Sequence, residues 1–176
     1  MKDNHSAYIG VGSNLGDRMS NCVRALDLLS SRKGIELVRV SRWFETEAVP
    51  SGGFSGGPPF LNAAVHVKTT LFAEELMKAM LDIEASLGRP SPRPKGEPRT
   101  VDLDLLLYDD LALHLKDLTL PHPELPKRLF VLVPLCDIAP EVVHPTSGLT
   151  IRDLERRCRN GGFAAGITEW KEATTE

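Results

Sequence analysis

The sequence has little of what marks disulfide-rich, metal-binding or membrane proteins. Its three cysteines, Cys22, Cys136 and Cys158, lie far apart and form no C-x-x-C pair, so we expect reduced thiols rather than a disulfide framework or a zinc site. No apolar run approaches the roughly 20 residues that a membrane-spanning helix needs. Positive charge is not in excess, because 21 basic and 24 acidic residues give a net charge of -3. This balance excludes a general attraction to nucleic acid or anionic lipid, so a phosphate site would need a local basic patch.

The chain has the length and composition of one globular domain. Its 176 residues are 41% hydrophobic and 26% charged, which is typical of an ordinary folded protein. We expect a catalytic domain over residues 1–160 and a C-terminal tail over 161–176, whose glycine-rich and then charged sequence is compatible with disorder. Residues 1–6 are polar and lack the pattern of a secretory signal, so we expect a cytoplasmic protein, by default a monomer.

Two common glycine-rich nucleotide motifs are missing. A dinucleotide fingerprint that starts at Gly10 and Gly12 would need glycine at position 15, where Leu15 stands. A phosphate-binding loop between Gly52 and Gly57 would need lysine at position 58, which is Pro58. Neither a Rossmann protein nor a P-loop kinase is therefore predicted.

Hydrophobic periodicity predicts four strands and two helices before residue 110. The predicted order is a strand at 7–11, a helix from Met19 to Leu29 capped by Asp17, a strand at 35–45, a strand at 60–69, a helix at 72–87 closed by Gly88, and a strand at 101–108. An apolar stretch at 129–138 and a weaker helix at 150–159 follow. This order indicates an α+β fold, a ferredoxin-like βαββαβ antiparallel sheet with helices packed on one face and a C-terminal extension.

Two loops are rich in residues that break regular structure. Residues 50–59 contain four glycines and three prolines, which predicts a loop that could act as a lid. Residues 89–99 contain four prolines and four basic residues, so they supply the local basic patch on an acidic chain. We expect both loops to close over bound substrates and exclude water.

An acidic pair lies directly after the basic loop. Asp102 and Asp104 are two residues apart on a predicted strand, so both side chains leave the same face. Mg²⁺ is suited by one or two carboxylates together with substrate phosphates, so the pair is a candidate magnesium site. The alternative is that the two residues are only the solvated face of an edge strand.

The cations beside this pair favour a polyphosphate substrate. Arg99 precedes Asp102 by three residues, and Arg89, Arg93 and Lys95 lie in the same loop. Transfer of a phosphoryl group needs charge neutralisation and positioning, and the planar fork of arginine suits phosphate oxygens. A solvated basic loop is the alternative, and the adjacent acidic pair disfavours it.

Four separated motifs, in this order, resemble those of the 6-hydroxymethyl-7,8-dihydropterin pyrophosphokinase family. They read Y-I-G-V-G-S-N-L-G-D-R, P-F-L-N-A-A-V, P-R-T-V-D-L-D-L-L-L and L-P-H-P-E-L-P-K-R-L-F-V-L-V-P-L, and the resemblance covers about residues 7–150. It implies transfer of diphosphate from ATP to the pterin hydroxymethyl group, with release of AMP, in folate biosynthesis. It also implies two Mg²⁺ ions as cofactors, and ATP and a reduced pterin as the molecules bound.

The resemblance also assigns roles residue by residue. Asp102 and Asp104 correspond to metal ligands, and Arg89 and Arg99 to arginines that hold the phosphates during transfer. The remaining expected contacts are Thr46, Phe60, Asn62 and Phe130 with the pterin, and Glu84, Arg93, Lys95, His122 and Arg128 with ATP. Phe60 and Phe130 would stack on the two faces of the ring, while Gly12, Ser13 and Asn14 would give structural support.

The chain also departs from the family pattern near the nucleotide. Gly96 and Glu97 stand where an aromatic residue and glycine are usual, and Leu81, Ser91 and Pro123 replace polar or aromatic residues. We therefore expect rearranged ATP contacts, with Arg93 substituting for the arginine missing at 91. Two other interpretations stay open from the residues alone: a magnesium-dependent phosphatase or nucleotidyltransferase, and a ferredoxin-like RNA-binding module. The acidic pair on the sheet opposes the second.

Overall fold

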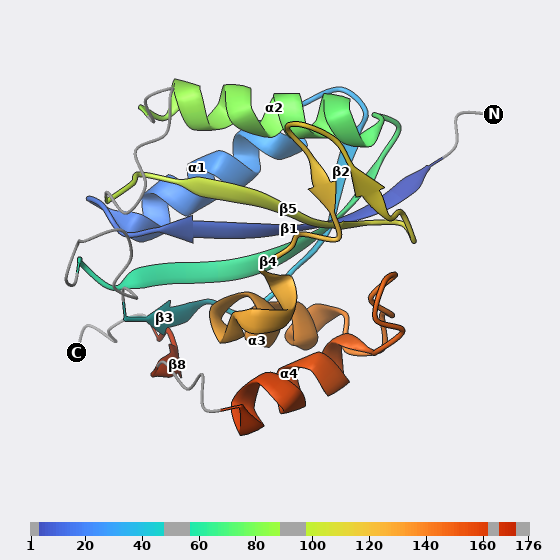
Figure 1. The fold of residues 1–176 in the computed structure, drawn as a ribbon. Helices are drawn as coiled ribbons and strands as arrows, with labels where there is room; N and C mark the ends of the chain where they lie inside the picture. Colours follow the sequence, from blue (N-terminus) through green and yellow to red (C-terminus); the bar gives the residue numbers. More distant parts are fainter. Residues whose placement is uncertain (1–3, 48–56, 89–97, 162–165, 172–176) are drawn as a thin grey trace.

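The computed structural model describes residues 4–47, 57–88, 98–161 and 166–171. These residues form an antiparallel sheet with helices on both sides (Figure 1). In chain order the elements are β1 (His5–Ser13), α1 (Arg18–Ser30), β2 (Ile35–Val40), β3 (Phe44–Thr46), β4 (Phe60–Thr69), α2 (Ala73–Ser86), β5 (Asp102–Tyr108), β6 (Leu113–His114), β7 (Thr119–Leu120), the 3-10 helix η1 (Leu125–Lys127), α3 (Leu129–Ile138), α4 (Ile151–Asn160) and β8 (Ile167–Glu169).

The main sheet is built around β1 and β4. Its strand order is β5-β1-β4-β3-β8, and β2 pairs with another part of β4. β4 has the bounds that its alternating sequence predicts, and the residues of its apolar face, from Leu61 to Val67, are buried. The two helices expected before residue 90 are confirmed within a residue or two of their predicted ends. Asp17 caps α1 by accepting a hydrogen bond from the Ser20 amide, and Gly88, at φ +87°, follows the end of α2.

The strand expected at 35–45 is divided into β2 and β3. Ser41, which lies between them, donates its amide to the carbonyl of Ala64, and its Oγ accepts a hydrogen bond from the Ala64 amide. The serine side chain thus replaces a backbone carbonyl in the pairing with β4. The β2–β4 register also shifts between Leu37 and Arg39. This irregularity bends the strand, so that β3 pairs with the Phe60 end of β4.

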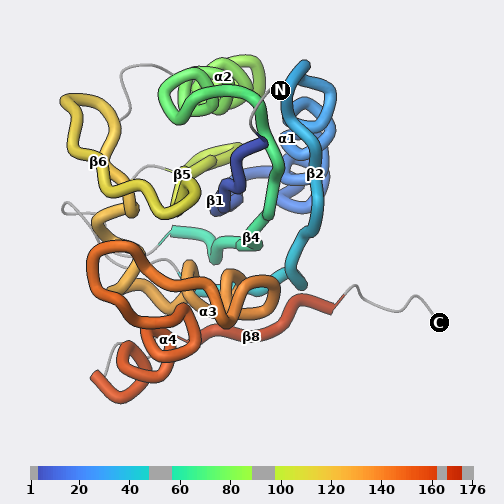
Figure 2. The backbone as a smooth tube through the Cα atoms, turned by 90° about the vertical axis from the view of Figure 1, so that its right-hand side faces the viewer, coloured from blue at the N-terminus to red at the C-terminus, as the bar shows by residue number. Residues whose placement is uncertain are grey.

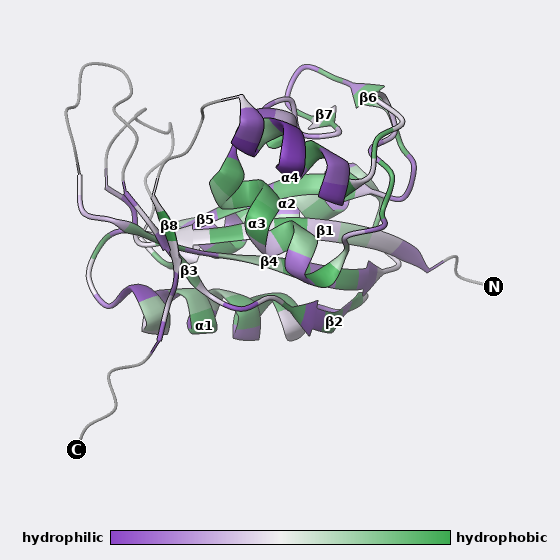
Figure 3. Ribbon diagram, turned by 90° about the horizontal axis from the view of Figure 1, so that it is seen from below, coloured by the Kyte–Doolittle hydropathy of each residue, from purple (hydrophilic) through white to green (hydrophobic). Residues whose placement is uncertain are grey.

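The expectation that helices cover one face only is wrong. α1 and α2 pack on one face through a core that includes Leu29, Leu76 and Met80, while α3 and α4 pack on the other (Figure 2). α3 is the apolar stretch at 129–138, and it lies between the sheet and α4. Figure 3 shows the result, with hydrophobic α3 inside and the hydrophilic face of α4 outside.

α3 and α4 cover the opposite face only in part. Their core reaches Ala64 of β4 and Leu106 of β5. The next positions along these strands toward the same end of the sheet carry polar groups, Asn62 on β4 and Asp104 on β5. The candidate site therefore begins where the apolar cover ends.

The segment expected to be a tail contains a strand. Residues 167–169 form β8, which pairs with β3, so the expectation of disorder is wrong for these residues.

All three cysteines are free, and burial raises the pKa of the Cys22 thiol to about 12. Among the helices in the described ranges, none has both the length and the apolar character needed to cross a membrane.

Candidate active site

Two rows of residues cross the sheet from β5 through β1 to β4. In the first row Gly12 lies between Asp102 and Asn62, and in the second Gly10 lies between Asp104 and Ala64. Because neighbouring strands are about 4.8 Å apart, the Cα atoms of Asp102 and Asn62 are separated by about 10 Å. The glycines leave a floor without side chains between them. This spacing suits substrates that are bound by carboxylates at one end of the site and by an amide at the other.

The acidic pair is accompanied by an arginine. Arg99 donates from Nη1 to Oδ2 of Asp102 at 2.7 Å, and the two side chains are 24% and 19% exposed. Both groups are thus reachable from solvent but partly shielded, which makes their interaction stronger than that of an exposed surface pair. Within the part of the chain that the structure describes, no set of three or more histidine, cysteine, aspartate or glutamate side chains forms a metal cage.

Asn14 fixes the segment that carries Arg99. Its side-chain Oδ1 accepts a hydrogen bond from the backbone amide of Arg99 at 2.8 Å, and its backbone amide donates to the Arg99 carbonyl at 3.1 Å. The Asn14 side chain also donates to the carbonyl of Pro58 at 3.3 Å, and the residue is 4% exposed. One buried side chain therefore joins the end of β1 to the described ends of both predicted loops. This geometry agrees with the structural support expected of the Gly12–Asn14 segment.

Glu84 lies under the acidic strand rather than on its open side. It is 2% exposed on α2, and its Oε1 accepts a hydrogen bond from the Leu103 amide at 2.7 Å. Leu103 lies between Asp102 and Asp104, so the buried carboxylate holds the backbone from which both acids project. The family resemblance predicts that the Glu84 carboxylate contacts ATP, and in the structure this carboxylate binds the Leu103 amide. The ATP role of Glu84 stays a prediction.

Three of the four residues expected to bind the pterin meet at the β3–β4 end of the site. Asn62, which is 5% exposed, donates from Nδ2 to Oγ1 of the buried Thr46 at 2.8 Å. Phe60 pairs with Thr46 across the two strands, and the guanidinium carbon of Arg99 lies 5.8 Å from the centre of its ring. Thr46, Asn62 and Phe60 are therefore brought together, beside Arg99.

Gly12 makes the closest approach in this floor. A Cβ atom built on it would lie 3.0 Å from Oδ1 of Asn62, which is tighter than ordinary contact. A Cβ on Gly10 would lie no closer than 3.6 Å to its neighbours. Glycine at 12 therefore lets Asn62 lie flat against β1, whereas position 10 has room for a methyl group.

We expect Gly12→Ala to raise the KM for the pterin by about tenfold, since overpacking costs about 1–3 kcal/mol and displaces the Asn62 amide. Gly10→Ala is the matched control, because it adds the same methyl group in the same strand without a close contact. Steady-state kinetics with each substrate varied in turn measures the effect. Equal KM values for the two variants would show that the close approach at Gly12 has no role in binding.

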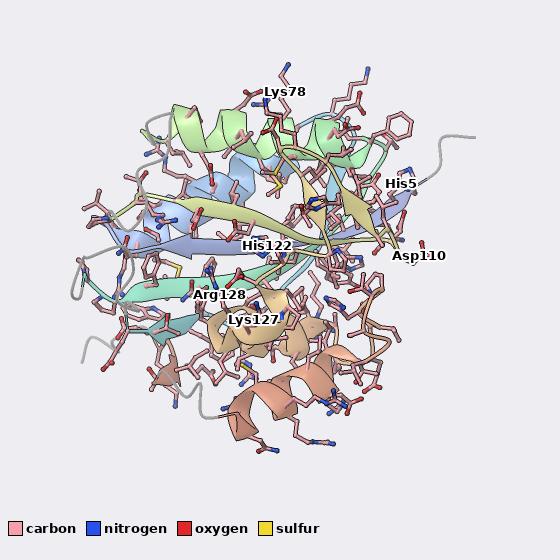
Figure 4. All side chains as sticks on the ribbon, in the orientation of Figure 1. His5, Lys78, Asp110, His122, Lys127 and Arg128 are labelled. Carbon is pink, nitrogen blue, oxygen red and sulfur yellow. The ribbon has the colours of Figure 1, made fainter. Side chains whose placement is uncertain are left out.

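His122 and Arg128 lie on the segment that follows β7, on the side of the sheet that α3 covers (Figure 4). The His122 amide donates to the carbonyl of Leu106, which places this segment beside β5. Burial, and next the charge of Arg128, lower the pKa of His122, while the charges of Glu124 and Asp102 oppose the shift. Arg128 forms an ion pair with Glu124 at 3.5 Å.

The neutral form of His122 has a defined tautomer. Its Nδ1 accepts a hydrogen bond from the Glu124 amide at 3.2 Å, so in the neutral ring the proton must be on Nε2. Nε2–H is thus a donor available for an anionic group. Phe130 is the other aromatic residue expected to contact the pterin. The centre of its ring lies 5.6 Å from the guanidinium carbon of Arg128. The structure places Phe130 on the Arg128 side of the site and Phe60 on the Arg99 side.

Three expected contacts, Arg89, Arg93 and Lys95, lie outside the described residues. Three of the departures from the family pattern, Ser91, Gly96 and Glu97, lie outside them as well. The same holds for most of the two loops expected to close, which overlap 48–56 and 89–97. Arg18 is a described residue near the site whose role no local sequence pattern predicts, because its partners Glu45, Pro59 and Trp170 are distant in the chain. Its one sequence signal is its place at the end of the motif Y-I-G-V-G-S-N-L-G-D-R.

The site has the parts expected of an enzyme that transfers a phosphorus-containing group. Adjacent carboxylates suit a divalent cation, a salt-bridged arginine and a neutral histidine can contact phosphate oxygens, and an oriented amide can bind a second molecule. A sheet that binds single-stranded RNA would instead need exposed aromatic residues and a basic surface.

Comparison with known proteins identifies the family. The model of the 7,8-dihydro-6-hydroxymethylpterin-pyrophosphokinase (HPPK) family matches residues 8–140. The chain belongs to this family, as the resemblance of its motifs indicates.

Individual relatives agree with this assignment. The chain is 40% identical to a 2-amino-4-hydroxy-6-hydroxymethyldihydropteridine pyrophosphokinase of Synechocystis over 153 residues, which cover 85% of this chain and 74% of the relative. It is also 40% identical to the Bacillus subtilis enzyme of the same name, over 79% of this chain and 81% of the relative. A solved HPPK-DHPS structure from Plasmodium falciparum matches with a TM-score of 0.72 at 15% identity, and therefore supports the fold alone.

Some relatives are much longer than this chain. The chain covers 46% of the Plasmodium HPPK-DHPS protein and 20% of a folic acid synthesis protein from Pneumocystis carinii. The similarity to these proteins concerns only the part that the chain spans.

Proposed function

We propose that this protein transfers diphosphate from ATP to the hydroxymethyl group of 6-hydroxymethyl-7,8-dihydropterin. The products are AMP and the pterin diphosphate, and the reaction belongs to folate biosynthesis. The observation that carries the proposal is the row Asp102–Gly12–Asn62, in a chain of the HPPK family. It places the strand positions that carry the carboxylate and the amide about 10 Å apart, on either side of a glycine.

The donor set around Asp102 and Asp104 fits magnesium. Two carboxylates on one strand face leave several coordination positions for phosphate oxygens and water, which Mg²⁺ prefers to a complete protein cage. We propose that the two acids hold two ions. When bound, Mg²⁺ neutralises charge on the phosphates and aligns them for displacement. Glu84 contributes from below by fixing the backbone between the two acids.

The cationic and donor groups of the chain would hold the triphosphate. The Arg99 guanidinium forms a salt bridge with Asp102. Phosphate oxygens that bind beside this carboxylate would therefore be close enough for Arg99 to contact them. His122 would donate from Nε2, and Arg128 would add positive charge on the same side. Arg89, Arg93 and Lys95 are the further phosphate contacts that we propose from the family resemblance.

The amide of Asn62 would bind the pterin edge. Its Nδ2 is used by Thr46, and this hydrogen bond turns Oδ1 toward the floor at Gly12. The oxygen is thereby oriented as an acceptor for a ring N–H of the pterin. Phe60 and Phe130 would contact the two faces of the ring. The pterin hydroxyl would then attack the β-phosphorus in line with the bond to the α,β-bridging oxygen, and that bond would break to release AMP.

The finer topology is part of this proposal. The order β5-β1-β4, with β2 and β3 both on the far side of β4, supports a ferredoxin-like βαββαβ sheet in which one strand is divided in two. We also propose that residues 1–160 hold the catalytic groups and that the enzyme acts as a cytoplasmic monomer.

Product analysis tests the proposed reaction. The protein is incubated with ATP, Mg²⁺ and the reduced pterin, and nucleotides are separated by ion-exchange chromatography. We expect AMP and pterin diphosphate in equal amounts, with no AMP when the pterin is omitted. Formation of ADP or inorganic phosphate would instead indicate a phosphatase or another transferase, and absence of any product would contradict enzymatic transfer to this pterin.

A further inference from the structure

β8 extends the sheet at the edge that carries the proposed pterin contacts. It pairs with β3 along the whole length of that strand, from Phe44 opposite Glu169 to Thr46 opposite Ile167 (Figure 1). The Trp170 amide continues the pairing by donating to the carbonyl of Trp43 at 2.8 Å. β3 has only three residues, so pairing on both sides matters more to its position than it would for a long strand. The match to the family model ends at residue 140, before β8.

Arg18 joins this added strand to two parts of the site. Its Nη2 forms an ion pair with Glu45 of β3 at 2.7 Å, and its Nη1 donates to the carbonyl of Pro59 at 2.8 Å. Its guanidinium carbon lies 5.0 Å from the centre of the Trp170 ring. The arginine side chain is 19% exposed, which favours a persistent contact over a solvated surface pair.

The partners of Arg18 are the direct neighbours of the proposed pterin contacts. Glu45 precedes Thr46, whose Oγ1 orients the Asn62 amide, and Pro59 precedes Phe60. A displacement of Arg18 would therefore move both the amide and the ring by way of the backbone. The acidic pair on β5 is two strands further across the sheet, and the backbone between the two acids is held by Glu84.

We infer that β8 and Trp170 hold Arg18 in place, and that Arg18 is a positioning residue for pterin binding. Trp170 covers the guanidinium, which in turn fixes β3 and the carbonyl before Phe60. The inference rests on the proposed function, because it requires that Asn62 and Phe60 bind the pterin. It assigns a role in substrate affinity to the C-terminal strand, beyond stabilising the edge of the sheet.

A set of variants tests this role. Arg18→Met keeps the aliphatic stem but removes the ion pair and the hydrogen bond to Pro59, and Trp170→Leu removes the aromatic ring. We expect the KM for the pterin to rise about fivefold in Arg18→Met and about threefold in Trp170→Leu, in line with the typical strength of partly buried cation–π and charged contacts. The KM for ATP and kcat should change less than the pterin KM, because the direct partners of Arg18 are Glu45, Pro59 and Trp170, and Arg99 is reached from them only through Phe60.

The double variant shows whether the tryptophan acts through the arginine. If it does, adding Trp170→Leu to Arg18→Met should change the pterin KM by no more than about twofold, because contacting residues are energetically coupled. Trp170→Phe should restore most of the affinity, since it retains an aromatic face. Arg152→Met is the control for loss of an arginine, because it removes an exposed ion pair between Arg152 on α4 and Glu141.

The possible failures can be told apart. If the wild-type protein forms no AMP from ATP and the pterin, the proposed function fails. If it does, an unchanged pterin KM in Arg18→Met, or an equal rise in the KM for both substrates, overturns the inference alone. Calorimetric titration of the pterin in the presence of a nonhydrolysable ATP analogue gives the affinity independently of turnover. A loss of thermal stability with unchanged pterin affinity would mean that β8 has a structural role only.

Discussion

Asp104→Asn and Asp102→Asn are each expected to lower kcat by about 1,000-fold, the loss typical when a group that stabilises transition-state charge is removed. Asparagine keeps the size of the side chain and one acceptor oxygen, but it cannot supply the negative charge that holds Mg²⁺ against a polyphosphate. Rapid-quench measurement of AMP formation in a single turnover would measure the chemical step without interference from product release.

The two substitutions differ in their secondary effects. Asp102→Asn also breaks the salt bridge to Arg99, whereas Asp104→Asn leaves that ion pair in place. Asp82→Asn is the matched control, because it neutralises an exposed aspartate on α2. It should retain at least about half of the wild-type kcat, since surface substitutions away from a site have small effects. Full activity in either site variant would show that the acids do not hold the cations of the reaction.

Arg99→Met is expected to lower kcat by about 100-fold to 1,000-fold, because one fixed charge donor to the transferred group would be lost. Arg99 is held for this role from two directions, by the Asp102 carboxylate at its side chain and by Asn14 at its backbone. The backbone contacts do not depend on the side chain, so the variant should keep the path of the segment while losing the guanidinium. Single-turnover kinetics at saturating ATP separates this loss from weaker nucleotide binding.

Arg99→Lys provides an internal comparison. Lysine restores the positive charge but not the planar fork, so kcat of Arg99→Lys should be about tenfold higher than kcat of Arg99→Met. Arg159→Met, which removes the ion pair with Glu155 on α4, controls for the loss of an arginine elsewhere. If Arg99→Met changed only the KM for ATP and left the chemical step intact, the arginine would have a role in binding rather than in transfer.

The sequence predicts those features that depend on local patterns. Strict alternation defines β4 with its observed bounds, and the same period of two places Asp102 and Asp104 on one face of β5. Asp17 marks the start of α1, and Gly88 marks the end of α2. The metal-site hypothesis is equally local, because it needs only the spacing of two acids and the nearby Arg99.

The remaining features depend on partners that are far apart in the chain. The division of one expected strand into two follows from a hydrogen bond between Ser41 and Ala64, which no local pattern predicts. β8 has only three residues and pairs with a strand more than 100 positions earlier, so its sequence carries no distinct signal. Arg18 is similarly defined by Glu45, Pro59 and Trp170. In the second layer of helices, the helix expected at 150–159 is confirmed as α4, whereas α3 was not predicted because the apolar run at 129–138 has no helical period that reveals a buried helix.

Calorimetric titration of α,β-methylene ATP, with and without Mg²⁺, tests the central claim most directly. The wild-type protein should bind this analogue at least about tenfold more tightly with Mg²⁺, and the variant with both Asp102→Asn and Asp104→Asn should lose that gain. If the double variant kept the full magnesium-dependent gain in affinity, the two acids would not be the groups that join the ions to the nucleotide, and the account of this site would be contradicted.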